Sequence, residues 1–212
     1  MLRSPDFLFD GPADAPLTVA LAHGAGAPMD SPFMAAFAEG LAAAGFRVAR
    51  FEFAYMADRR RTGVRRPPDR APVLLETWRA AVRTLGPERL VIGGKSLGGR
   101  TASVIADEAQ VRGLVCLGYP FHPPGHAPGK AATAERLAHL ADIRTQTLIC
   151  QGTRDALGSR EDVKSYKLSG AVRLHWLEDG DHGFKPRKSS GRSEAENRRD
   201  AIAAVVAFAK GL

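Results

Sequence analysis

The sequence has few cysteines and no long apolar run. Its two cysteines, Cys116 and Cys150, lie inside apolar stretches, which fits buried reduced thiols better than a disulfide framework. No stretch approaches the roughly 18 consecutive apolar residues of a membrane-spanning helix. The first residues, MLRSPDFLFDG, place charge and proline where a signal peptide has an apolar core. The sequence therefore predicts a cytoplasmic protein without a membrane partner.

Signatures of nucleotide and metal binding are also missing. Gly94–Ser96 resembles the end of a phosphate-binding P-loop, but Arg89 stands where that motif needs glycine. Gly24–Gly26 begins like a dinucleotide fingerprint, but Met29 occupies the position of its third glycine. No cysteine, histidine and carboxylate cluster has metal-ligand spacing. We therefore predict neither a cofactor nor a metal.

The composition is that of an ordinary globular domain. The chain has 212 residues, of which 44% are hydrophobic and 25% charged, so a single domain over residues 1–212 is expected. The formal net charge of +7 is unevenly distributed. Residues 58–70 and 185–199 each hold six basic and two acidic residues. The positive charge that would attract an anionic partner therefore lies in these two stretches rather than over the whole chain.

Apolar runs alternate with segments of helical spacing. The runs predict strands at residues 17–24, 46–53, 89–94, 113–118, 146–152 and 172–178, with helices expected at 32–44, 72–85, 97–110 and 194–210. This alternation predicts a doubly wound α/β fold, a mainly parallel sheet of six to seven strands with helices on both faces. A further run at Phe7–Asp10 is expected to add an antiparallel edge strand.

The segment Gly94–Gly98 matches the pattern G-x-S-x-G. An apolar strand leads into it and a helix-like segment follows, so Ser96 is expected on a sharp strand-to-helix turn with its hydroxyl exposed above the sheet. The alternative is a serine that caps the N-terminus of a helix. In a parallel sheet the loops after the strands gather at one edge, where ligands bind.

A nucleophilic serine needs a base, which in turn needs an orienting acid. Asp155 follows the strand at 146–152 and His182 follows the strand at 172–178, so both lie on the expected edge of the sheet. Asp181 is the alternative acid. The simpler interpretation is that Asp155 is a turn residue and that His182 is an ordinary loop histidine.

Acyl transfer also needs two N–H donors for an oxyanion. Leu97 supplies the N–H that follows the serine. The second donor is expected from Ala25, with Gly26 as the alternative, because this glycine-containing turn follows the first long strand. We interpret the neighbouring His23 as structural.

These motifs together resemble the alpha/beta-hydrolase fold, and more narrowly its small capless dienelactone-hydrolase-like serine hydrolases. The resemblance extends from Leu17 to the C-terminus and rests on HGAGAP, GGKSLGGR, GYPFHPPG, QGTRDALG and DGDHGF. It implies a nucleophile, acid and base at Ser96, Asp155 and His182, oxyanion donors at Ala25 and Leu97, and a carboxylic ester or thioester as substrate. The sequence departs from the cysteine-dependent dienelactone hydrolases, because position 96 is serine.

Several residues near the predicted strand ends are candidates for substrate contact. The loop at 119–133 is too short for a cap domain, so an open site is expected. Its histidines, His122 and His126, are candidate contacts. The simpler interpretation of the two basic stretches is a solvated, mobile loop in each case. The sharper hypothesis is that they frame the pocket and favour substrates with a remote carboxylate or phosphate. The candidate binding residues are Tyr55, Tyr119, Phe121, His122, Phe184, Arg65 and Arg66. The alternative for the aromatic residues is that they simply cover the core.

Two other function classes remain open from the sequence. The resemblance includes a hydrolase-like domain of a chromatin-associated regulatory protein, so a non-catalytic interaction module is the main alternative. The arginine runs suggest a polyanion binder, but they contain no interleaved aromatic residues and no known nucleic-acid-binding motif. We therefore expect a small-molecule ester as the partner and no nucleic acid.

Overall fold

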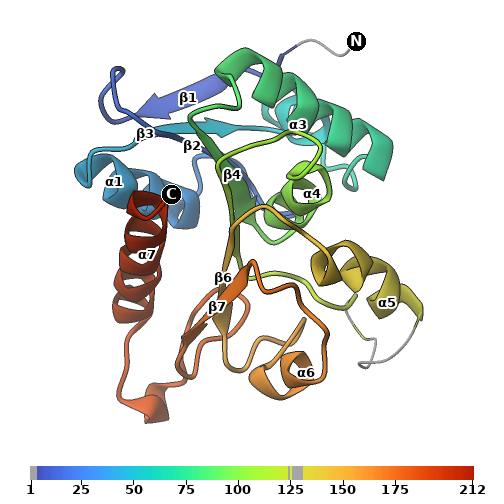
Figure 1. Ribbon diagram of the computed structural model, residues 1–212, viewed down its shortest axis with the longest axis vertical. Helices are drawn as coiled ribbons and strands as arrows, with labels where there is room; N and C mark the ends of the chain where they lie inside the picture. Colours follow the sequence, from blue (N-terminus) through green and yellow to red (C-terminus); the bar gives the residue numbers. More distant parts are fainter. Residues whose placement is uncertain (1–3, 124, 126–130) are drawn as a thin grey trace.

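The computed structural model describes residues 4–123, 125 and 131–212, and its strands form one seven-stranded sheet (Figure 1). The strands are β1 (Phe7–Asp10), β2 (Thr18–Ala22), β3 (Arg47–Phe51), β4 (Leu90–Lys95), β5 (Gly113–Leu117), β6 (Thr147–Gly152) and β7 (Val172–Leu177). Their order in the sheet is β1-β3-β2-β4-β5-β6-β7. Only β1 runs antiparallel to its neighbour. The predicted fold class and the predicted antiparallel edge strand are both confirmed.

Helices cover both faces of the sheet. They are α1 (Pro32–Ala43), α2 (Ala54–Thr62), α3 (Ala71–Leu85), α4 (Leu97–Ile105), α5 (Ala131–Leu137), α6 (Arg160–Lys164) and α7 (Glu194–Lys210), with short 3-10 turns η1 (Ala138–Ala141) and η2 (Lys188–Ser190). In Figure 1, α1 and α7 lie on one side of the sheet, and α3, α4, α5 and α6 lie on the other. No helix in the described part of the chain is long and apolar enough to cross a membrane.

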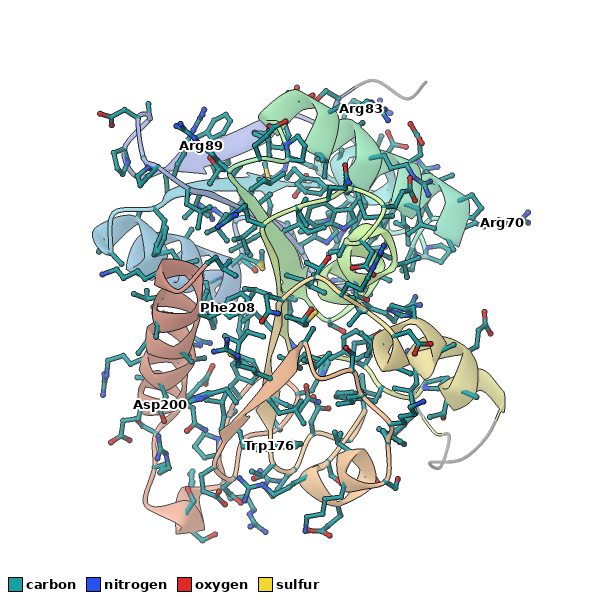
Figure 2. All side chains as sticks on the ribbon, viewed as in Figure 1. Arg70, Arg83, Arg89, Trp176, Asp200 and Phe208 are labelled. Carbon is teal, nitrogen blue, oxygen red and sulfur yellow. The ribbon has the colours of Figure 1, made fainter. Side chains whose placement is uncertain are left out.

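The central strands send alternate side chains into two separate cores. In β4, Leu90 and Ile92 pack with the helices on one face, whereas Val91 packs with α1 and α7 on the other. Burial on both faces explains why the central strands β2, β4 and β5 are rich in apolar residues. Figure 2 shows Phe208 of α7 between its helix and the sheet, while Arg70 and Arg83 extend outward.

The two cysteines lie on opposite faces of the sheet. Cys116 belongs to the core beneath α4 and Cys150 to the core beneath α7, and both are free and buried. Burial raises the pKa values of both thiols, that of Cys150 to about 12. They are therefore inert parts of the core, as the apolar sequence around each predicts.

The helices differ from the predicted ones at the end of α4, and α2, α5 and α6 were not among the predicted helices. The helix after Ser96 ends at Ile105 rather than 110, and Gln110 adopts a left-handed φ of 51°. Ala54–Thr62, where no helix was predicted, forms α2, which is capped at its C-terminal end by Gly63 with a φ of 74°. Only Tyr55 and Met56 of α2 are buried, so its arginine-rich sequence has no apolar stripe to reveal the helix.

Candidate active site

Ser96 lies at the sharp turn between β4 and α4. Its backbone has φ 50° and ψ −110°, a conformation that is strained for a residue with a side chain. Two glycines make the turn possible. A Cβ atom at Gly94 or Gly98 would lie 2.0 or 2.3 Å from the carbonyl oxygen of Ala22. The flanking glycines thus allow α4 and β4 to approach β2 this closely.

Three side chains form a continuous chain of hydrogen bonds at this turn. Ser96 Oγ lies 2.9 Å from His182 Nε2, and His182 Nδ1 lies 2.8 Å from Asp155 Oδ2. Asp155 is fully buried, whereas the His182 side chain is 31% exposed. A carboxylate can only accept at Nδ1, so the ring proton lies there and Nε2 presents its lone pair to the serine hydroxyl.

The loops after β6 and β7 bring Asp155 and His182 together. The N–H of Arg154 donates to the carbonyl of Gly180 at 2.9 Å, which ties one loop to the other. A Cβ atom at Gly152 would lie 2.3 Å from the Gly180 carbonyl oxygen, so the close approach requires glycine. The parallel pairing of β6 and β7 places both loops at the same edge of the sheet.

Asp155, and not Asp181, contacts the histidine ring. Asp181 Oδ1 instead accepts the N–H groups of Gly183 and Lys185 at 2.7 and 2.9 Å, which shapes the turn that carries His182. Sequence order alone left this choice between the two aspartates open.

Asp155 is itself held by a buried amide that sequence analysis missed. Gln151 Nε2 donates to Asp155 Oδ2 at 2.8 Å, and the N–H of Leu157 donates to Oδ1 at 2.8 Å. The Gln151 side chain is fixed in turn because its Oε1 accepts the N–H of Tyr119 at 2.7 Å. A polar residue within an otherwise apolar strand was the signal in the sequence that pointed to this position.

The two candidate oxyanion donors are Leu97, which follows Ser96 in the chain, and Ala25, which borders the pocket beside Ser96. Leu97 is the first residue of α4, so its N–H has no acceptor within the helix. Ala25 borders the same pocket as Ser96, because β2 pairs directly with β4 and Ala22 lies opposite Gly94. The Tyr55 hydroxyl donates to the Ala25 carbonyl at 3.0 Å and steadies this loop.

His23 is buried beneath the same loop. Its Nδ1 lies 2.6 Å from the carbonyl oxygen of Gly24, and its Nε2 accepts the N–H of Phe53 at 3.2 Å. One nitrogen therefore donates and the other accepts, which requires a neutral ring. Burial lowers the pKa of His23 in agreement with this state. The contacts fit the structural role expected from the sequence.

A pocket of about 480 Å³ opens beside Ser96. It is bordered by the loop after β2, the start of α1 and the first turns of α7. Phe33 and Met34 contribute apolar surface, and Glu194 and Arg198 form an ion pair at the opposite wall. The lining residues are Gly24, Ala25, Gly26, Ala27, Ser31, Phe33, Met34, Lys95, Ser96, His182, Gly183, Glu194 and Arg198.

The aromatic residues expected to line the pocket lie in the protein core instead. Tyr55, Tyr119, Phe121 and Phe184 are at most 3% exposed. His122 is 5% exposed and has Nε2 3.7 Å from an Asp162 carboxylate oxygen. Each follows a strand end, but burial of its ring turns it under the loop rather than toward the pocket. His126 lies outside the described residues.

The arginines expected at the pocket also lie elsewhere. Arg65 and Arg66 are exposed in the segment between α2 and α3, and Arg66 pairs with Asp58. Arg60 bridges Asp30 and Glu52, so part of this basic stretch holds neighbouring loops together.

Two arginines of the second basic stretch, residues 185–199, have different roles. Arg187 bonds to Asp179 and lowers the pKa of that carboxyl to about 2. Arg198, by contrast, lines the pocket. Sequence analysis missed Arg198, Phe33 and Met34 because they lie in helices rather than in loops after strands.

Lys95 is a further pocket residue that the sequence did not single out. Its ammonium group donates to the carbonyl oxygen of His182 at 2.5 Å and lies 5.4 Å from the centre of the Phe33 ring. Burial lowers the pKa of Lys95 to about 8. Among the described residues, no group of three or more histidine, cysteine or acidic side chains is arranged to hold a metal.

Known proteins share both the sequence pattern and the fold. A family model described as an alpha/beta hydrolase domain matches residues 15–210. An alpha/beta serine hydrolase homologue from Coxiella burnetii is 18% identical, with 96% of this chain and 99% of that chain covered and a TM-score of 0.67.

Two further solved structures have the same fold. A serine hydrolase without a lid from Xanthomonas campestris is 18% identical, with coverage of 97% and 95% and a TM-score of 0.67. A monoacylglycerol lipase from Paleococcus ferrophilus is 15% identical, with coverage of 97% and 99% and a TM-score of 0.69. At these identities the likeness concerns the fold.

Proposed function

The chain belongs to the alpha/beta hydrolase family, and from this premise we propose that it is a serine hydrolase that cleaves carboxylic esters or thioesters through an acyl-enzyme on Ser96. The observation that supports this most directly is the hydrogen-bond chain from Ser96 Oγ through the His182 ring to the buried Asp155 carboxylate. It combines a nucleophile, a base with its lone pair toward the nucleophile, and an acid that orients the base.

Acylation begins when Ser96 Oγ attacks the carbonyl carbon of the substrate. His182 Nε2 takes the hydroxyl proton, and the electron pair of the C=O bond moves to the oxygen to give an oxyanion. The N–H groups of Leu97 and Ala25 are the proposed donors to that oxyanion. When the intermediate collapses, the bond to the leaving group breaks and His182 returns the proton to the departing alcohol or thiol.

Deacylation repeats these steps with water as the nucleophile. His182 Nε2 accepts a proton from water as it attacks the acyl carbon, and then gives that proton to Ser96 Oγ as the acid is released. Asp155 holds the ring in the correct tautomer and stabilises the imidazolium that forms in both halves of the reaction.

The pocket suggests the class of substrate. Phe33 and Met34 suit an apolar portion of an ester, whereas Arg198 and Lys95 place positive charge on other parts of the lining. We propose that substrates with a remote carboxylate or phosphate are preferred, because such a group pairs well with a guanidinium. We further propose a cytoplasmic location, in accord with the two free, buried cysteines.

The test is the substitution Ser96→Ala. Wild-type protein is expected to hydrolyse small p-nitrophenyl esters and to be labelled by a fluorophosphonate probe, and both reactions are expected to disappear in the variant. The exposed Ser189, substituted by alanine, is the matched control and should retain both. Labelling that persists after Ser96→Ala would rule out this nucleophile. A folded wild-type protein that neither turns over esters nor reacts with the probe would favour the non-catalytic interaction module.

A further inference from the structure

Lys95, the residue just before the proposed nucleophile, joins the strand that carries Ser96 to the loop that carries His182. Its Nζ donates to the His182 carbonyl oxygen at 2.5 Å, so the contact fixes the main chain of the proposed base itself. The rings of Phe33 and Phe184 flank the ammonium group, with centres 5.4 and 5.6 Å from Nζ. Such faces favour a cation over a neutral group.

The ammonium group also lies beside the His182 ring. A Cβ atom at Gly118 would be 2.6 Å from Lys95 Nζ and 3.4 Å from His182 Nδ1, so the two nitrogens border the same small space. Any side chain at position 118 would displace one of them. The absence of a side chain at Gly118, which has a φ of 69°, therefore leaves room for the lysine to reach the histidine.

The charged groups around His182 determine what effect the Lys95 ammonium group has on the ring. Asp155 is buried against the His182 ring and Asp181 precedes the histidine in its own loop, so two carboxylates lie close to the ring and to the Lys95 ammonium group. Glu194 and Arg198 on α7, which also line the pocket, pair with each other. Lys95 thus places a cation beside a ring that also faces these carboxylates, and a neighbouring cation opposes the addition of a second proton to an imidazole.

We infer that Lys95 is a positioning residue of the proposed active site, which holds the His182 main chain through a hydrogen bond and keeps the His182 ring neutral through its charge. A neutral ring is the form that accepts the Ser96 proton, so Lys95 extends the activity of the base toward lower pH. This inference rests on the proposed function, because it assigns Lys95 an effect on the proposed base.

The test measures the His182 ring directly. NMR of protein labelled with carbon-13 in histidine gives the pKa of His182 in wild type and in Lys95→Met, which removes both the charge and the hydrogen bond. We expect the pKa to rise by about one unit, the size typical when a nearby charge is removed from a partly screened site. The rate of Ser96 labelling by a fluorophosphonate at pH 6.5 is expected to fall by about tenfold or more.

Two further variants separate the effects. Lys95→Gln keeps a hydrogen-bond donor but removes the charge. It should therefore raise the His182 pKa, with a smaller loss in the labelling rate at high pH than Lys95→Met. This variant also replaces Lys95→Met in the test if the methionine variant does not fold. Lys185→Met removes an exposed lysine from the same loop and should leave both readouts unchanged.

The outcomes separate this inference from the proposed function. An unchanged His182 pKa in folded Lys95 variants, or a change no larger than that in Lys185→Met, overturns the role of Lys95. A wild-type protein whose Ser96 is not labelled, but whose His182 pKa responds to Lys95, overturns the proposed function and leaves the electrostatic coupling in place.

Discussion

His182 Nε2 lies 2.9 Å from Ser96 Oγ although the two residues are 86 positions apart in the chain. The contact depends on the ends of β4 and β7, which the sheet order places at the same edge although β5 and β6 lie between them. A change at Nδ1, the other nitrogen of the ring, should therefore reach the serine through the imidazole.

Substitution of Asp155 by asparagine is expected to reduce kcat/KM for an activated ester by about 1,000-fold or more. An amide at this position can donate to Nδ1 and so stabilises the wrong tautomer of His182, with its proton toward Ser96. Steady-state hydrolysis of a p-nitrophenyl ester measures the effect.

The comparison for this prediction is Asp181→Asn. Its amide oxygen can still accept the N–H groups of Gly183 and Lys185, so kcat/KM for the same ester should fall by less than about tenfold. If the two variants lost equal activity, Asp181 would have to be reconsidered as the orienting acid.

His23 should contribute much more to the stability of the fold than His182. His23→Ala leaves the buried N–H of Phe53 without an acceptor and opens a cavity, so the free energy of unfolding should fall by about 3 kcal/mol. His182→Ala should change it by less than about 1 kcal/mol, because that ring is partly exposed. Urea unfolding at pH 7.5 gives both values, and a larger loss for His182→Ala would contradict the structural role of His23.

The stability that His23 provides should also depend on pH. Its pKa is lowered in the folded state, so below the ordinary value of 6.5 the unfolded chain binds a proton that the folded ring resists. The stability difference between wild type and His23→Ala should therefore shrink as pH falls through 6.5, by up to about 1.4 kcal/mol per pH unit. A constant difference between pH 7.5 and pH 5 would argue against a neutral buried ring.

Gly98 should not tolerate even alanine. Its Cβ atom would meet the main chain of β2, at 2.3 Å from the Ala22 carbonyl oxygen, which cannot move without breaking the sheet. We expect Gly98→Ala to lower the free energy of unfolding by about 3 kcal/mol. Gly170→Ala is the control, since no atom lies within 4 Å of its Cβ position, and it should leave stability unchanged or slightly raised. Equal effects in thermal or urea unfolding would refute the steric argument.

Arg198 should determine the preference for anionic substrates. Arg198→Gln is expected to lower the ratio of kcat/KM for a carboxylate-bearing ester to that for a matched neutral ester by about tenfold, because a guanidinium–carboxylate pair is lost. Arg65→Gln and Arg66→Gln should leave this ratio within about twofold, as both residues lie away from the pocket. A drop in the ratio for the Arg65 or Arg66 variant, but not for Arg198→Gln, would indicate that the exposed stretch between α2 and α3, rather than Arg198, contacts the anionic group of the substrate.

The stability of the wild-type protein relative to a variant without Lys95 should increase as the pH rises through the mildly alkaline range. Its pKa is lowered to about 8 when folded, whereas an unfolded lysine titrates near 10.5, so between these values the unfolded chain holds the additional proton. The stability of wild type relative to Lys95→Met should rise with pH across this window, by at most about 1.4 kcal/mol per unit. A flat or falling difference in urea unfolding at pH 8, 9 and 10 would show that the ammonium group is not buried as described.

The sequence contained enough information for most of the sheet and for the three central side chains. Buried parallel strands are apolar throughout, and the positions just after them are few, so Ser96, Asp155 and His182 were found from spacing and order. Burial of two cysteines in separate strands was predictable for the same reason.

The lining of the pocket was less predictable. Whether an aromatic residue after a strand faces a cavity or the core depends on packing that no local pattern encodes, as Tyr119 and Phe121 demonstrate. Phe33 and Arg198 belong to α1 and α7, and their approach to Ser96 follows from how these helices lie on the sheet. The role of Lys95 likewise depends on a contact with the main chain of a distant loop.

The pairing of β2 with β4 has a consequence for how the protein acquires its site during folding. Ala22 pairs with Gly94, and β6 and β7 must then add to the far side of β5 before Asp155 and His182 reach Ser96. Contacts between distant segments carry a loop-closure cost and form more slowly than local ones. A partly folded chain can therefore hold the serine turn in place while lacking its base, so reactivity with an active-site probe should report completion of the sheet.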